Sequence, residues 1–188
     1  MKSVQNLIAL ARARPGELNY ASGAMGSTTH LSSELFKAMA GIDIVRINYK
    51  GSAAALNAVI GGQVQLMFPI AAEVAPHVKS GRVRALAVAS AQPSLLAPGL
   101  PTMAASGLPG YESGTVHGLL APAKTPELII NRLHQEIVRF INKAEVREKL
   151  FNLGLDIVAS SPDEFAASIK SEMARMGKLI KDFGIRAD

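Results

Sequence analysis

The chain has 188 residues, no cysteine and a formal net charge of +5 at pH 7. With 48% hydrophobic and 19% charged residues it can bury enough apolar surface to fold, which excludes a disordered or fibrous protein. The absence of cysteine excludes a disulfide scaffold, a thiolate metal site and a cysteine nucleophile. The positive net charge suits an anionic ligand, an acidic partner or plain solubility. Lys and Arg are scattered and only 5% of residues are aromatic, so we expect no nucleic acid.

Strand and helix signals alternate over the first half of the chain. The predicted helices lie between Ser3 and Pro15, between Ser27 and Gly41, over 52–60 and over 71–80. The predicted strands lie over 18–22, 43–49, 64–68 and 83–90. This alternation with short connections predicts an α/β fold with a parallel or mixed sheet, helices on both faces, and ligand loops at the carboxyl edge.

The second half of the chain has a different pattern. Residues 91–113 are rich in Pro and Gly, which predicts a long ordered loop or a domain crossover. The elements expected after it are a strand over 115–123, a helix from Thr125-Pro126, a short helix over 145–153, a strand over 155–159 and a final helix. Ser161 and Glu164 form a capping box for that final helix.

Neither a membrane span nor a leader is predicted. The stretch 51–77 lacks Lys and Arg but is interrupted by polar residues such as Gln63 and Glu73, so we expect a protein that is not embedded in a membrane. The opening MKSVQNLIALARARPG lacks an apolar core followed by a small-residue cleavage site. It predicts an amphipathic helix and no signal peptide in this chain.

The stretch SGAMGSTTH, residues 22–30, is the most informative motif. A strand ends there, two glycines free the backbone, and a helix begins at Ser27 and Thr28. The unpaired N–H groups of such a first turn, together with the helix dipole, attract an anion. YKGSAAAL, residues 49–56, repeats the arrangement with Gly51 and Lys50. The two helix starts predict a site for one carboxylate or phosphate, although Gly and Ser are also ordinary residues of such turns.

Other site chemistries have weaker support. No Walker or GxGxxG pattern is present, so no nucleotide is expected. Ser27, His30 and Glu34 lie on one face of a predicted helix and resemble a catalytic nucleophile, a base and the residue that orients the base. A serine at a helix start, however, usually caps the backbone N–H groups, and the spacing of His30 and Glu34 predicts an ordinary i,i+4 pair. The four histidines are widely separated. We therefore expect no catalytic residue, no metal and no cofactor.

Eight motifs, in this order along the chain, resemble the Bug-type substrate-binding proteins of tripartite tricarboxylate transporters. They are KSVQNLIALARARPGELNYAS, GSTTHLSSELFKAMAGIDIV, YKGSAAAL, GGQVQLMF, PHVKSGRVRALAVAS, LPTMAASGLPGYE, GLLAPAKTP and SPDEFAASIKSEM. The resemblance implies a periplasmic receptor with a two-lobed, type II periplasmic-binding-protein fold. Such receptors capture small carboxylates (dicarboxylates, tricarboxylates, acidic amino acids or aromatic acids), deliver them to the permease subunits of a membrane transporter, and catalyse nothing.

The resemblance also implies a ligand site between lobes. The loops matching 22–30 and 49–52 would hold the ligand together with a loop from the other lobe. The site residues expected from it are Ser22, Gly23, Met25, Gly26, Ser27, Thr28, His30, Tyr49, Gly51, Ser52 and Phe68. Two departures weaken this transfer: Pro69 follows Phe68 where the family often has a polar residue, and 116–118 lacks an aromatic residue frequent there.

The resemblance implies a domain organisation as well. Residues 1–113 would be lobe two, the βα ligand-binding lobe, and residues 114–188 the C-terminal segment that normally completes lobe one. The chain thus reads as truncated at its N-terminus relative to the family. A return segment without its partner strands exposes a sheet edge, which favours a homodimer. The alternative function is a cytoplasmic ligand-sensing or protein-interaction module that reuses the same lobe.

Overall fold

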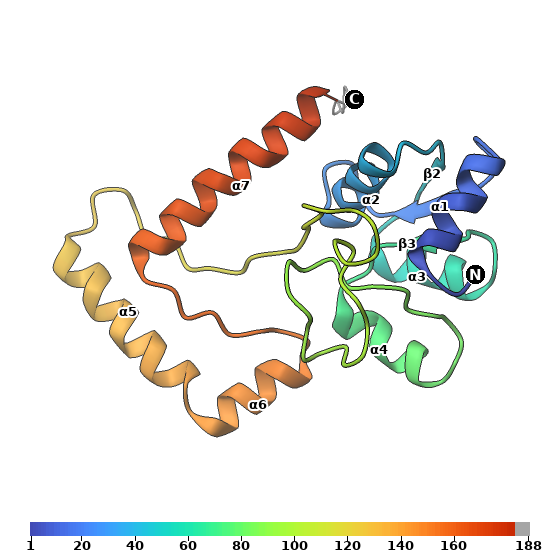
Figure 1. The fold of residues 1–188 in the computed structure, drawn as a ribbon. Helices are drawn as coiled ribbons and strands as arrows, with labels where there is room; N and C mark the ends of the chain where they lie inside the picture. The colour runs from blue at the N-terminus through green and yellow to red at the C-terminus, as the bar shows by residue number, and fades with distance from the viewer. Residues whose placement is uncertain (183–188) are drawn as a thin grey trace. The chain divides into compact units, whose positions relative to one another are not determined.

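The fold of residues 1–182 is described by a computed structural model (Figure 1). Its helices are α1 (Val4–Ala13), α2 (Thr28–Ala40), α3 (Ser52–Ile60), α4 (Ala71–Lys79), α5 (Glu127–Ile141), α6 (Ala144–Asn152) and α7 (Pro162–Asp182). Its strands are β1 (Asn19–Ser22), β2 (Val45–Asn48) and β3 (Leu66–Met67). Residues 1–115 form one compact unit, and the described residues from 116 on form another.

The first unit is built on a small parallel sheet in the order β2-β1-β3, so β1 lies in the middle. The register pairs Ser22 with Asn48, and β1 and β2 therefore end side by side. The helices α2, α3 and α4 follow β1, β2 and β3 in turn. The predicted α/β fold with a parallel sheet is confirmed.

Side chains that alternate along β1 belong to two different cores. Tyr20 is fully buried in a core shared with α1 and α2, whereas its neighbour Ala21 is buried against α3. Successive residues of a strand point to opposite faces, so helices cover both faces of the sheet, as predicted. The larger core contains Val4, Leu7, Ala11, Leu18, Tyr20, Phe36, Ala40, Ile42, Ile44, Met103, Leu108 and Tyr111.

The Pro-rich segment after the sheet is tied to α2 by polar contacts. The Tyr111 hydroxyl donates to the Ser32 carbonyl at 2.9 Å, and the Ser32 and Ser113 hydroxyl oxygens lie 2.6 Å apart. Thr115 Oγ1 is 3.1 Å from Thr28 Oγ1 at the start of α2. The segment is thus an ordered part of the first unit.

Three predicted strands are wrong. Over 83–90 only Val88 forms a bridge, a parallel one to Thr102, and no strand forms over 115–123 or 155–159. Ala159 has φ +53°, outside the extended region. These apolar stretches carry a strand-like pattern, but a strand exists only where a neighbour completes the backbone ladder, and the described residues supply none there.

The second unit consists of α5, α6 and α7 with their connections, and α5 contacts both other helices. The predicted capping box is present: the Ser161 N–H donates to Glu164 Oε2 at 2.8 Å and the Glu164 N–H donates to Ser161 Oγ at 3.2 Å. The bond from the Ser161 N–H, together with one from the Ser161 hydroxyl to the same carboxylate oxygen at 2.9 Å, lowers the pKa of the Glu164 carboxyl. A Cβ atom added to Gly118 would lie 2.1 Å from the Phe165 ring, so the glycine lets the ring approach the backbone.

Candidate functional site

The two predicted ligand loops meet at Gly23. The Tyr49 N–H donates to the Ser22 carbonyl at 2.9 Å, which joins the ends of β1 and β2. A Cβ atom built on Gly23 would lie 3.6 Å from Ser27 Oγ and from Thr29 Oγ1, and 3.9 Å from the carbonyl carbon of Gly51. The space beside Gly23, where another residue would have its Cβ atom, is therefore bounded by the start of α2 and by the loop before α3.

The start of α2 has the geometry of an anion site. Ser27 caps the helix, accepting from the His30 N–H at 3.4 Å, and Gly26 before it has φ +76°. The Gly23 N–H donates to Thr29 Oγ1 at 3.0 Å, which folds the loop onto the helix. The first N–H groups of a helix have no intrahelical acceptor, so those of Thr28 and Thr29 are available to a ligand at the positive end of the dipole.

The predicted helix over 52–60 is present as α3, but the hydroxyl group at its start is engaged within the protein. Gly51, with φ +97°, is the residue before the helix, and Ser52 is its first residue. The Ser52 hydroxyl donates to the carboxylate of Glu73 on α4. It is therefore already engaged, and the ligand donors that α3 retains are its first backbone N–H groups.

His30 is buried and acts as a hydrogen-bond acceptor. The Gly26 N–H donates to its Nδ1 at 3.1 Å, which assigns the ring proton of the neutral form to Nε2. Burial, followed by the positive charge of Arg46, lowers the pKa of His30. The ring thus holds the Gly26 turn only while it is neutral.

The expected pairing of His30 with Glu34 is wrong. The Glu34 carboxylate instead accepts a hydrogen bond from the Tyr20 hydroxyl and lies 3.7 Å from the Lys37 ammonium. Ser27 Oγ contacts the backbone N–H of His30, and the ring of His30 bonds elsewhere. The resemblance to a nucleophile, base and orienter is therefore not realised in the geometry.

Acidification is expected to destabilise the first unit through His30. Because the folded-state pKa lies below the unfolded value of about 6.5, the unfolded chain binds more protons there, and the free energy of unfolding falls as pH drops below about 6.5. His30→Asn, which keeps an acceptor near the Nδ1 position, should flatten this dependence. Urea unfolding at several pH values measures it, and an equally steep dependence in the variant would contradict the assignment.

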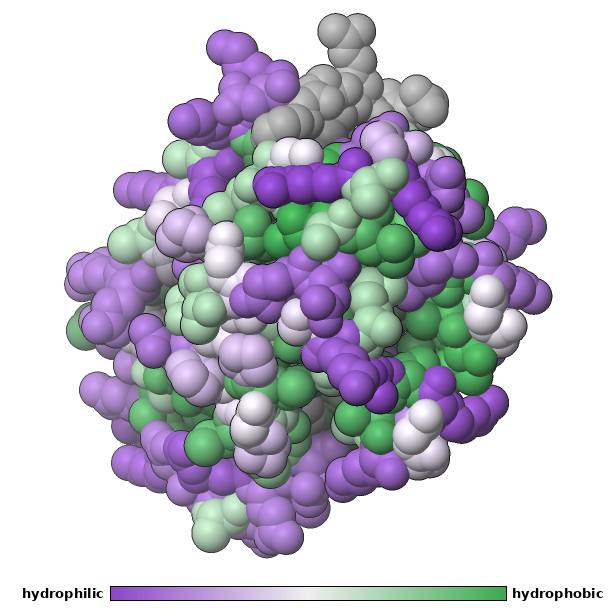
Figure 2. All heavy atoms as spheres, turned by 45° about the vertical axis from the view of Figure 1, so that its right-hand side comes forward, coloured by the Kyte–Doolittle hydropathy of each residue, from purple (hydrophilic) through white to green (hydrophobic). Residues whose placement is uncertain are grey.

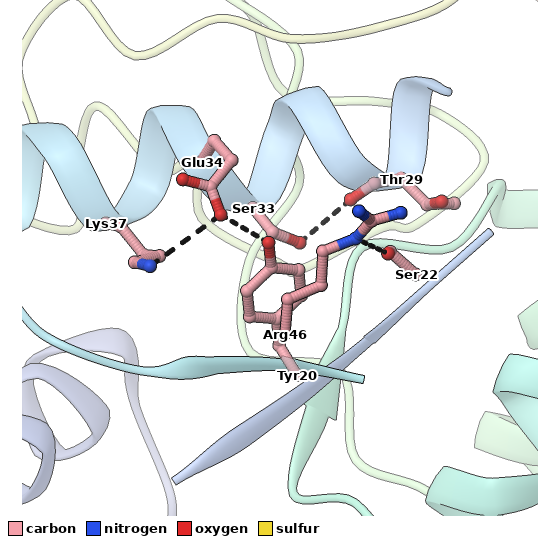
Figure 3. Close-up of polar contacts among 7 residues, drawn as sticks. All are labelled: Tyr20, Ser22, Thr29, Ser33, Glu34, Lys37 and Arg46. Atoms are coloured by element: carbon pink, nitrogen blue, oxygen red, sulfur yellow. Dashed lines mark hydrogen bonds and ion pairs between the residues drawn. The ribbon is translucent and has the colours of Figure 1, made fainter. Parts of the chain in front are cut away.

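A polar network fastens α2 to the sheet (Figure 3). The buried Tyr20 hydroxyl reaches Glu34 from β1, and the Ser33 hydroxyl donates to the Thr29 carbonyl at 2.8 Å. Burial, with the hydrogen bond to Glu34, raises the pKa of Tyr20, which stays protonated at neutral pH. The Tyr20 contact therefore fastens α2 to β1, and the Ser33 bond lies within the helix.

Arg46 is the residue of this region that the sequence prediction missed. It lies on β2, and its Nε donates to Ser22 Oγ at 2.7 Å. One terminal nitrogen donates to the Gly23 carbonyl at 3.0 Å and to Asn48 Oδ1 at 3.2 Å. Arg46 is half-buried on the edge strand β2, where charged side chains are ordinary, so no sequence signal distinguished it.

Two of the predicted site residues, Phe68 and Met25, lie in contrasting surroundings: the first packs against a core and the second is exposed. The Phe68 ring packs in the larger core, with its centroid 5.6 Å from that of Phe36 and 6.1 Å from that of Tyr111. Met25, in contrast, is exposed on the loop before α2. Their contact with a ligand stays a prediction.

Among residues 1–182, no group of three or more His, Asp or Glu side chains could hold a metal ion. No helix in the same range has the length and apolar character needed to cross a bilayer.

Comparison with known proteins identifies a family match over residues 1–185, described as the tripartite tricarboxylate transporter family receptor. The chain is 35% identical over 188 residues to a UPF0065 protein from the tcbD-tcbE intergenic region of Pseudomonas sp. (strain P51), covering 100% of this chain and 56% of that protein. It is 34% identical to protein BugT of Bordetella pertussis, covering 99% of this chain and 57% of BugT. The chain thus spans little more than half the length of these relatives.

Solved structures of similar proteins also match nearly the whole of this chain and less than two thirds of their own length. An R. palustris protein with adipate is 38% identical, with a TM-score of 0.83, covering 98% of this chain and 62% of that one. The periplasmic binding protein BugD is 27% identical, with a TM-score of 0.82 and coverages of 100% and 64%. MatC from Rhodopseudomonas palustris with bound malate is 25% identical, with a TM-score of 0.76 and coverages of 95% and 62%.

Proposed function

The chain belongs to the tripartite tricarboxylate transporter receptor family, and on this basis we propose that it binds a small organic carboxylate in the periplasm for delivery to a membrane permease. The observation that carries the proposal is the meeting of the two predicted ligand loops at Gly23 in a chain of this family. Two similar solved structures contain adipate and malate, which supports a dicarboxylate as the ligand class.

The binding mechanism that we propose relies on backbone donors. A ligand carboxylate would accept hydrogen bonds from the N–H groups of Thr28 and Thr29 at the start of α2. Charged acceptors make shorter and stronger bonds than neutral ones. An acid would therefore be favoured over its amide. Gly23 would allow the ligand to approach the backbone closely, because no Cβ atom occupies the space beside the two hydroxyls.

The domain organisation predicted from the resemblance is part of the proposal. Residues 1–113 would form the ligand-binding lobe, and the segment from 114 on would belong to the other lobe. The division of the described residues near 115 is compatible with this assignment. The remaining ligand contacts would come from a part of the relatives that lies outside this chain's match.

A thermal-shift comparison of adipate and malate with their neutral diamides tests the ligand class. At about 100 times its dissociation constant, a ligand stabilises the folded chain by about 2.7 kcal/mol, or about 5–10 °C in Tm for this size. We expect a shift with the acid and none with the diamide. Equal shifts, or no shift with any of these acids, would contradict the proposal.

Gly23→Ala tests the position of the site. Gly23 has no positive φ, and the added Cβ would make only ordinary contacts at 3.6 Å or more, so Tm without ligand should hardly change. The methyl group would occupy the space between the loops, and affinity for the acid should fall about tenfold, as for one lost charged hydrogen bond. Gly114→Ala, at a position with open space, is the matched control. Unchanged affinity in Gly23→Ala would place the ligand elsewhere.

A contact with protein is the second candidate function, favoured by exposed apolar side chains in the second unit. Leu128 on α5 is 84% exposed and Leu120 is 81% exposed, and apolar residues also reach the surface on the face drawn in Figure 2. Large apolar side chains gathered at a surface are typical of interaction sites. The candidate partners are permease subunits and a second copy of the chain. Sedimentation velocity over a concentration series tests whether the chain forms a homodimer.

A further inference from the structure

Arg46 joins the two loops of the proposed site. From β2 its side chain reaches across to the end of β1, where it bonds to Ser22 Oγ and to the Gly23 carbonyl. A further bond goes to Asn48, the last residue of β2. One guanidinium therefore contacts the first two residues of the loop 22–30 and the residue that precedes the loop 49–52.

The charge of Arg46 has no counter-ion among residues 1–182. A neighbouring cation, Lys37, pairs with Glu34 at 3.7 Å, whereas no carboxylate lies within ion-pair distance of Arg46 in that range. An arginine has five N–H donors, and the three bonds of Arg46 use Nε and one terminal nitrogen. The other terminal nitrogen has no acceptor among the described residues.

The free end of the guanidinium lies close to the proposed ligand donors. Figure 3 shows the terminal nitrogens of Arg46 directed toward Thr29 in the first turn of α2. The charge acts on that turn, since it contributes to the lowered pKa of His30. An anion bound at the start of α2 would lie in the field of this half-buried charge, where solvent screens it less than at an open surface.

We propose that Arg46 strengthens the preference of this site for a carboxylate over a neutral group, through its uncompensated positive charge and its free terminal nitrogen. The inference rests on the proposed function. A purely structural arginine, one that only links Ser22, Gly23 and Asn48, would affect acids and amides alike. The two roles therefore predict different ratios between the dissociation constants for an acid and for its amide.

The experiment compares dissociation constants for adipate and for its diamide in the full chain and in three variants. Arg46→Gln removes the charge and keeps an amide donor, and Arg46→Lys keeps the charge and loses the planar fork. Arg82→Gln removes the same charge from an exposed residue after α4 and is the matched control. We expect Arg46→Gln to weaken adipate binding about tenfold with little change for the diamide, and Arg46→Lys to retain most of the acid preference.

The outcomes separate the two proposals. If the unsubstituted chain binds no acid, the proposed function fails, and this inference fails with it. If the chain binds adipate and Arg46→Gln keeps the same acid-to-amide ratio, or matches Arg82→Gln, the inference alone is overturned. If Arg46→Gln does not fold, Arg46→Lys decides: a retained preference supports the role of the charge, and a lost one overturns it.

Discussion

Replacing Phe36 with alanine is expected to lower the free energy of unfolding of the first unit by about 3–5 kcal/mol. Phe36 lies on α2 with an exposed fraction of 0%, and its ring packs against Phe68 in the larger core. Truncation removes buried apolar area and leaves a cavity that a rigid parallel sheet cannot close. Few other single changes in the unit would remove as much buried surface.

Tyrosine fluorescence during urea unfolding measures this effect. The chain has three tyrosines and no tryptophan, and Tyr20, Tyr49 and Tyr111 all lie in the first unit, so the signal reports on that unit alone. Leu95→Ala is the matched control, because Leu95 is 78% exposed and its truncation should change stability by less than about 0.5 kcal/mol. Similar midpoints for the two variants would show that Phe36 is not a core residue.

The Phe36 variant should also alter the proposed site. Phe68 is one of the expected ligand residues, and its ring is held between Phe36 and Tyr111. Without Phe36 the Phe68 ring gains freedom, and α2, whose first turn carries the proposed ligand donors, loses a fully buried side chain from the larger core. Any acid-dependent thermal shift should therefore decrease in this variant even where it remains folded.

The parts of the fold that local chemistry determines were predictable from the sequence. The caps at Ser3, Ser27 and Ser161 mark helix starts, and the structure has each of them. The alternation of β1, β2 and β3 with helices was sufficient to predict the parallel sheet. The resemblance carried by the eight motifs is confirmed by the family match, whose description is that of a receptor and not an enzyme.

The parts that depend on distant partners were not predictable. Whether 83–90 or 115–123 becomes a strand depends on a neighbouring strand, which periodicity alone cannot supply. The Ser52 hydroxyl bonds to Glu73 and Glu34 bonds to Tyr20 because the fold brings residues from other elements to them. For the same reason Arg46 looked like an ordinary strand residue until its contacts with Ser22 and Gly23 were visible.

Replacing Gly51 with alanine is expected to reduce both stability and ligand binding. Gly51 has φ +97° and ψ 166°, a region that is essentially restricted to glycine and costs other residues about 1–3 kcal/mol. A Cβ atom there would meet nothing within 4 Å, so the cost comes from backbone strain and not from a clash. Relief of that strain would shift the first turn of α3 and misplace its N–H donors, and affinity for the acid should fall as well.

The contrast with two other glycines makes this a sharp test. Gly114→Ala adds a Cβ in equally open space without a positive φ, so its unfolding free energy should stay within about 0.5 kcal/mol of the unsubstituted chain. Gly23→Ala should lose affinity without losing stability, whereas Gly51→Ala should lose both. Urea unfolding and adipate titration of the three variants measure this. If Gly51→Ala has the same free energy of unfolding as Gly114→Ala, the loop before α3 does not need a residue with positive φ. The proposed site would then rest on the start of α2 alone.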